Sequence, residues 1–143
     1  MTHVFDGFNY IVRLKKGELL IESLTMLAKE QKITGAWISG LGAALWCELG
    51  FYHLDTQEYS FKRIDPPAGA LEITGLQGNI AWADDKPVIH IHGSFSDEQM
   101  RGYGGHVKEL AAGATCEIFL HQSQVDFKRS YDEQTGLKLL DLQ

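Results

Sequence analysis

Residues 36–54 read AWISGLGAALWCELGFYHL, and this stretch decides the fold class. It is mostly apolar and is interrupted by glycines such as Gly40 and Gly42. A glycine inside a strand weakens it and marks a bulge, a sharp bend or a close approach of two backbones. The stretch therefore predicts two strands, residues 36–44 and 45–54, in a strongly curved sheet.

Most of the chain on either side has the pattern of β-strands as well. Some segments are rich in aromatic and β-branched residues, and others alternate polar and apolar residues, as a strand with one buried face does. The remaining expected strands are residues 8–14, 57–64, 71–81, 86–95, 107–110 and 114–127. The tail is expected to contain a turn at residues 133–136 and a last apolar stretch.

Only one segment has the pattern of a long helix. Leu20, Leu24 and Leu27 recur at i, i+4 and i+7 and so form one apolar face. Glu18 suits the positive end of the helix dipole, and Gly35 is the expected stop. One helix among many strands predicts an α+β fold, in which a curved, mostly antiparallel sheet packs with the helix.

The bulk properties describe an ordinary globular chain. Its 143 residues suit a single domain over residues 1–143, and no linker or repeat interrupts them. No segment is apolar for long enough to span a membrane, and the first residues lack a signal-peptide pattern. The expected location is the reducing cytoplasm. Cys47 and Cys116 lie in apolar runs, which favours buried thiols over a disulfide.

The charge distribution argues against a surface built to bind nucleic acid. The net charge is −6, whereas proteins that bind DNA through its phosphates normally present a basic face. The basic pairs Lys15–Lys16, Lys62–Arg63 and Lys128–Arg129 are scattered along the chain. They are interpreted as solvated surface charges, unless the fold or an oligomer brings them together.

Two histidines stand out among the six in the chain. His90 and His92 flank Ile91 in VIHIH, a segment that otherwise reads as a buried strand. Side chains two apart on a strand point to the same face, so the two imidazoles are expected side by side. A metal ion would satisfy both rings. The alternative is a pair of hydrogen-bonded histidines on an exposed strand face.

His106 is the best candidate for a third ligand. It follows Gly104 and Gly105, which free the backbone to fold back towards the HIH strand. The sequence SDEQ at residues 96–99 resembles a capping box and predicts a short helical turn between the two segments. Three histidines and a water molecule would form an open tetrahedral site, for which zinc is the expected divalent metal.

Other polar residues offer weaker candidates. Glu117 lies in an apolar strand, and a place on the solvent face of that strand is the favoured explanation; the alternative is a general base beside a metal. His121 is a minor candidate for a fourth ligand. His3 and His53 are interpreted as isolated structural or surface residues.

The ordered motifs of the chain resemble a known family. The segments are RLKKGELLIESLTMLAKEQKI (residues 13–33), ISGLGA (38–43), LGFYHLDTQEYSF (49–61), LEITGLQGNIA (71–81), KPVIHIHGSFSD (86–97), GYGGHV (102–107) and ATCEIFL (114–120). In order and spacing they are similar to the prokaryotic branch of the plants-and-prokaryotes-conserved (PPC) domain. Each motif is weak alone, and their combination over nearly the whole chain is specific.

The resemblance implies a sheet packed with one helix and a homotrimer. It also implies a divalent metal held by the histidines of HIH and GGH, which are His90, His92 and His106 here. Plant members join the domain to AT-hooks that bind the DNA minor groove, and bacterial relatives are labelled DNA-binding by that analogy. This chain has no such hook.

Three functions follow from these observations. The first is a trimeric metal-binding protein, with metal-assisted chemistry on a small molecule that the sequence does not identify. The second is a DNA-associated regulator, by family analogy and by the basic pairs. The third is a trimeric protein-interaction module in which the metal is structural.

Overall fold

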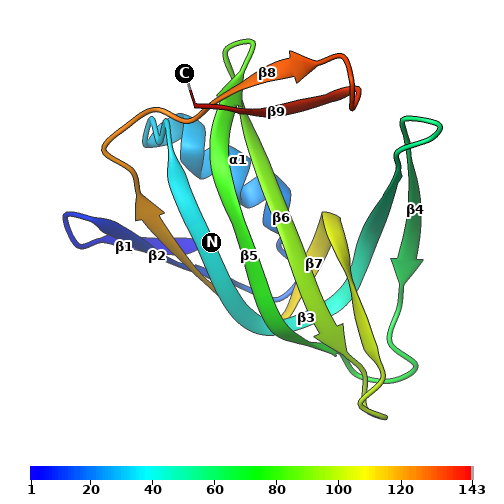
Figure 1. Cartoon of the computed structure of the whole chain (residues 1–143). Coiled ribbons are helices and arrows are strands. Elements are labelled where there is room, and N and C mark those ends of the chain that lie inside the picture. Colours follow the sequence, from blue (N-terminus) through cyan, green and yellow to red (C-terminus); the bar gives the residue numbers. More distant parts are fainter. Residues whose placement is uncertain (143) are drawn as a thin grey trace.

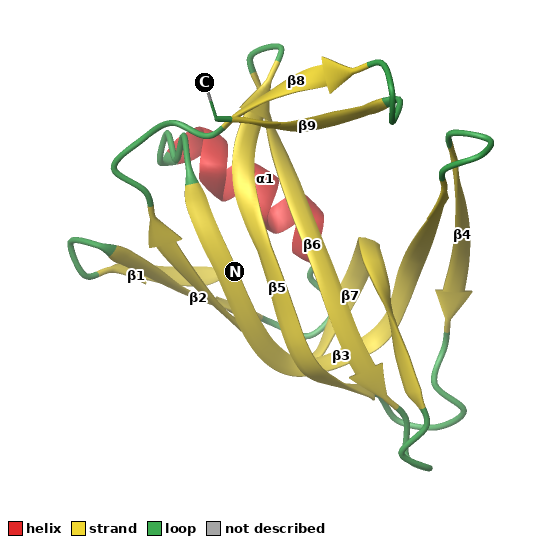
Figure 2. Ribbon diagram, viewed as in Figure 1, coloured by secondary structure: helices red, strands yellow, loops and turns green. Residues whose placement is uncertain are grey.

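The computed structural model describes residues 1–142, in which strands curve around one helix (Figures 1 and 2). In chain order the elements are β1 (Thr2–Phe5), β2 (Asn9–Leu14), α1 (Leu20–Glu30), β3 (Ala36–His53), β4 (Glu58–Ile64), β5 (Leu71–Ala83), β6 (Lys86–Ser96), β7 (Gly102–Gln122), β8 (Lys128–Asp132) and β9 (Leu137–Asp141). No helix within this range is long and apolar enough to cross a membrane.

The sheet runs in the order β1-β2-β7-β3-β5-β8-β9. In addition, β4 pairs with β3, and β6 pairs with both β5 and β7. Strands β3, β5, β6 and β7 therefore pair in a closed circuit, which requires strong curvature. Every pairing is antiparallel except a short parallel contact between β5 and β8. The predicted α+β fold with a curved, mostly antiparallel sheet is confirmed.

Two strands are longer than the sequence suggested. The expected strands 36–44 and 45–54 are one strand, β3, and β7 likewise joins the two strands predicted between residues 107 and 127. The reason is that bulges bend these strands without ending them, and one register shift in β3 lies between Gly40 and Gly42. Gly42 has φ +140°, and a Cβ there would lie 2.3 Å from the Thr115 carbonyl oxygen. Strands β1, β8 and β9 were not predicted.

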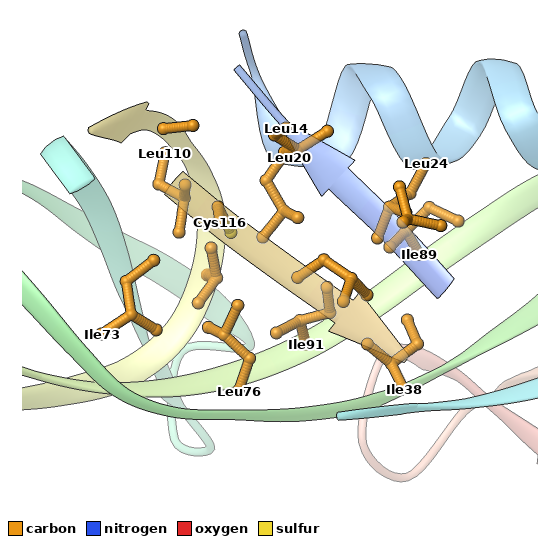
Figure 3. Close-up of a cluster of buried hydrophobic side chains, with 14 of the residues drawn as sticks. Leu14, Leu20, Leu24, Ile38, Ile73, Leu76, Ile89, Ile91, Leu110 and Cys116 are labelled. Atoms are coloured by element: carbon orange, nitrogen blue, oxygen red, sulfur yellow. The ribbon is translucent and has the colours of Figure 1, made fainter. Parts of the chain in front are cut away.

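The helix supplies one side of the core. Leu20, Leu24 and Leu27 are fully buried, as the periodicity predicted, and Figure 3 shows Leu20 and Leu24 among side chains of the sheet. Because unfolded chains expose these groups, each buried leucine contributes about 1.5–3 kcal/mol.

Both ends of the helix differ from expectation. At the start, the Glu109 carboxylate of β7 accepts hydrogen bonds from the backbone N–H groups of Ile21 and Glu22. At the end, the Ile33 N–H donates to the Ala28 carbonyl and Lys32 has φ +52°. This is the Schellman arrangement, which ends the helix before Gly35.

The connection between β6 and β7 is a tight loop and lacks the helical turn predicted for residues 96–99. Asp97, not Ser96, organises it, because the buried Asp97 carboxylate accepts hydrogen bonds from the Gln99 and Arg101 backbones, the Arg101 side chain and the Tyr103 hydroxyl. Burial alone would raise the pKa of Asp97, but these bonds lower it to about 2. The loop thereby fixes the register between β6 and β7.

Changing Asp97 to asparagine is expected to lower the melting temperature, because the neutral amide weakens the bonds to Arg101 and Tyr103. In the wild type, the stabilisation from Asp97 is present above pH 3.8 and is lost as the pH falls towards 2, since the folded-state pKa is lowered. Thermal melts of D97N and of the neighbouring exposed control Glu98→Gln measure this. Equal melting temperatures for the two variants would contradict it.

Candidate metal centre

Three histidines meet on the outer face of the sheet. In β6, Ile89 and Ile91 are buried in the core, so the alternation of a strand turns His90 and His92 to the opposite face. Strand β7 begins beside β6, and the pairing places His106 opposite His92. The two-residue spacing of His90 and His92, and the pairing of His92 with His106 across the strands, thus bring the three rings together.

The distances between the rings allow a shared ion. Ring centroids are 5.2 Å apart for His90–His92 and His90–His106, and 5.6 Å apart for His92–His106. One ring nitrogen of each residue lies within 4.8 Å of the corresponding atoms of the others. Two nitrogens bound to one tetrahedral zinc ion are about 3.3 Å apart. Small side-chain rotations would close the remaining difference.

The surroundings favour neutral imidazoles, the form that binds metals. Burial, together with Arg129 and the two other histidines, lowers the pKa of His90 to about 4. Burial, His92 and Arg129 also lower the pKa of His106. Within residues 1–142, His106 Nδ1 is a buried nitrogen without a hydrogen-bond partner. An unsatisfied buried nitrogen is unfavourable, and a metal ion would satisfy it, so the residues fit such an ion.

Polar groups of other strands surround the histidines. Asn79 and Gln77 of β5 lie opposite His90 and His92 in the β5–β6 pairing. Arg129 Nη2 donates a hydrogen bond to Asn79 Oδ1 at 2.9 Å and lies 3.1 Å from His90 Nδ1.

The hairpins β3–β4 and β8–β9 both protrude from the sheet (Figure 1), and side chains of the first reach the turn of the second. The Tyr52 hydroxyl donates to the Thr135 carbonyl, and the Gln57 side chain donates to the Gln134 carbonyl. On the β4 side, the Tyr59 ring packs against His106 with centroids 5.1 Å apart.

A cavity of about 350 Å³ opens beside His90 and His92. Its lining residues are Trp37, Ile38, Ser39, Gln77, Gly78, Asn79, His90 and His92.

Residues 1–124 match the model of the Plants and Prokaryotes Conserved (PCC) domain, the family that the sequence motifs resemble. The chain belongs to this family. Among curated proteins, none matches the sequence of this PCC domain.

Solved structures share the fold over nearly the full chain. A "putative DNA binding protein" from Bacteroides thetaiotaomicron VPI-5482 is 24% identical, with a TM-score of 0.91 over 98% of this chain and 96% of its own. A "putative DNA-binding protein" from Ralstonia eutropha JMP134 is 27% identical, with a TM-score of 0.91 over 99% and 96%. A metal-containing protein from Archaeoglobus fulgidus is 32% identical, with a TM-score of 0.84 over 98% of both chains.

The other candidate residues of the PCC domain lie apart from this cluster. Glu117 accepts a hydrogen bond from the Thr115 hydroxyl and stands opposite Arg13 and Leu41 in the sheet. His121 Nδ1 is 2.7 Å from Asn9 Oδ1. Neither Glu117 nor His121 belongs to the group of converging ligand atoms.

The remaining histidines and the cysteines have separate environments. His53 contacts the Ser60 hydroxyl, and His3 packs near Tyr10. Cys47 and Cys116 are buried free thiols, as predicted, and burial raises the pKa of each to about 12.

The basic pairs include residues that already have partners. Arg63 pairs with Asp65 at 3.0 Å and lies 4.1 Å over the Trp46 ring. Arg129, interpreted from the sequence as a surface charge, is half-buried beside His90. The ion pair of Arg63 and the partial burial of Arg129 leave fewer exposed, unpaired cations for DNA phosphates than the sequence suggested.

Sequence reasoning missed three residues around the histidines: Asn79, Tyr59 and Arg129. Asn79 is a polar residue in an apolar strand, a signal that could have been used. Tyr59 and Arg129 are ordinary residues of polar segments, and only the contact between the two hairpins explains their positions.

The metal-free protein is expected to lose stability as the pH falls from 7 to 5. Because the pKa of His90 is lowered to about 4, the unfolded chain binds more protons than the folded one between pH 6.5 and 4. Urea unfolding of chelator-treated protein at both pH values measures this change. His90→Gln should show a smaller change of stability with pH than the wild type; equal changes for the two proteins would contradict the prediction.

Proposed function

We propose that this PCC domain binds one divalent metal ion through His90, His92 and His106, with zinc as the ion that three imidazoles suit best. The observation that carries the proposal is the convergence of three ring nitrogens within 4.8 Å. The unpartnered His106 Nδ1 and the lowered pKa values support it. The 32% identity to a metal-containing protein adds further support.

Three protein ligands leave a tetrahedral ion with an open position, and such an ion polarises a carbonyl or lowers the pKa of bound water. This centre would then act on a small molecule in the adjoining cavity of about 350 Å³. A general-base role for Glu117 stays a prediction, and its contact with Thr115 does not connect it to the histidines.

Elemental analysis of protein purified without a histidine tag tests the metal. About one metal ion per chain is expected for the wild type, and His90→Ala should lose it. Protein that is free of metal and takes up none when zinc is added would refute the proposal.

The proposed oligomer is a homotrimer. The outer face of β2, β7 and β3 exposes apolar side chains, and Trp37, Leu41 and Phe119 retain 53%, 52% and 44% exposure. Neighbouring apolar residues of this kind favour an interface between subunits. Light scattering after size exclusion measures the mass of the particle in solution. A monomeric mass would refute the trimer.

DNA binding is a second candidate, favoured by the names of the Bacteroides and Ralstonia proteins. The net charge of −6 on this chain argues against it, because DNA is also negatively charged. A binding assay with AT-rich duplex over a salt series decides it, because phosphate contacts give a steep salt dependence. No binding at low salt would remove this function.

A trimeric interaction module with a structural metal is the third candidate. Removing the metal with a chelator distinguishes this function from that of a centre with an exchangeable ion. A structural metal should hold the oligomer together, so chelation should dissociate the trimer.

A further inference from the structure

Arg129 is a half-buried cation beside His90. Within residues 1–142 no carboxylate lies within ion-pair distance of its guanidinium. Its hydrogen bonds go to neutral groups, the Lys138 carbonyl and Asn79 Oδ1, and Nη2 also lies 3.1 Å from His90 Nδ1. Its Nε is buried, and no described residue accepts a hydrogen bond from it. A desolvated guanidinium of this kind has unused capacity to bind an anion.

The contact with His90 is incompatible with a metal ion on that ring. A guanidinium only donates hydrogen bonds, so His90 Nδ1 accepts and the proton of the neutral ring is on Nε2. Neither nitrogen is then free to be a ligand. Binding of a metal by His90 therefore requires Arg129 to leave Nδ1, which would place a free guanidinium beside a divalent cation.

We propose that Arg129 binds the carboxylate of a small organic acid that occupies the space between it and the metal ion. The proposal rests on the proposed metal site. An anion placed there removes the repulsion between two neighbouring positive charges and gives the released N–H groups an acceptor. The planar fork of arginine matches the two oxygens of a carboxylate.

The adjoining cavity could hold the rest of such a ligand. Arg129 does not line this cavity itself, but Asn79, which accepts a hydrogen bond from Arg129, does. Its volume of about 350 Å³ is at the lower end of the range for small-molecule sites. Trp37 and Ile38 offer an apolar wall, while Gln77 and Asn79 offer amide groups that orient polar substituents.

Arg129 also lies outside residues 1–124, the part that the PCC model matches. It enters through the β8–β9 hairpin, whose turn is held by Tyr52 and Gln57 of the β3–β4 region. This carboxylate subsite is therefore supplied by the C-terminal segment of this chain. Proteins that have the same histidines but lack this arginine would then bind different ligands.

Cobalt-loaded protein titrated with acetate at constant ionic strength tests the proposal. Acetate should change the visible cobalt bands of the wild type in a saturable way. Arg129→Met should weaken acetate binding at least tenfold and, in buffer without acetate, should bind cobalt more tightly, because the competitor for His90 is gone. Arg129→Lys should retain part of the acetate affinity, and Arg63→Met, a change on the exposed β4 surface, should behave as the wild type.

The outcomes separate this proposal from the metal site. Normal cobalt bands with equal acetate affinity in the wild type and both Arg129 variants would overturn the carboxylate subsite and leave the metal site standing. A response to inorganic phosphate but not to acetate would overturn the carboxylate class. Absence of cobalt binding would overturn both proposals. Circular dichroism melts check that the Arg129→Met and Arg129→Lys proteins are folded.

Discussion

Replacing His92 with alanine is expected to weaken zinc binding by more than about a hundredfold. Mutation of residues that only support a metal ligand typically lowers affinity about 10- to 100-fold, and His92 is itself one of the three proposed ligands. Its side chain is exposed, so truncation leaves no hole in the core and should change the melting temperature of the metal-free protein little. The effect therefore isolates metal binding from folding.

Competition with a chromophoric chelator measures the zinc affinity of the His92→Ala variant. His121→Ala is the matched control, because His121 is also an exposed histidine on a strand of the same sheet but contacts Asn9 instead of the cluster. We expect its zinc affinity to equal that of the wild type. If the His92 and His121 variants bind zinc equally well, the three-histidine site is wrong.

The main features of the fold could be predicted because they depend on local patterns. The leucine periodicity of α1 and the alternation of β6 each follow from contacts with a single core. The lengths of β3 and β7 could not be predicted, because a glycine inside a strand reads equally as a bulge or an end. The pairing of Gly42 in β3 with Cys116 in β7 resolves that ambiguity. This contact joins residues far apart in the sequence, so no local pattern reveals it.

The candidate site shows the same division. His90 and His92 follow from a two-residue spacing, and His106 was identified from the glycines that precede it, although the expected helical turn is a loop built on Asp97. Arg129 could not be found in this way. Its place beside His90 depends on a hairpin that folds back across β5, and no local pattern encodes that contact.

Replacing Gly78 with alanine is expected to destabilise the protein by about 3 kcal/mol, at the upper end of the usual cost of overpacking. Gly78 of β5 faces Ile91 of β6, and a Cβ at this position would lie 2.0 Å from the His90 carbonyl oxygen and 2.9 Å from Ile91 Cα. Both are backbone atoms, so no side chain can rotate away. The two strands must separate, and His90 moves with β6.

Gly75→Ala is a control in the same strand. The nearest atom to a Cβ there is Ser94 Oγ at 3.5 Å, an ordinary van der Waals contact, so its stability should change by no more than about 0.5 kcal/mol. Urea unfolding of both variants at one protein concentration compares them, since oligomerisation makes stability concentration-dependent. Zinc affinity should fall for the Gly78 variant alone, because the strand that carries two of the proposed ligands is displaced. Equal stability of the two variants would show that β5 and β6 are not as close as the structure places them, and the position of His90 beside Asn79 would then be wrong as well.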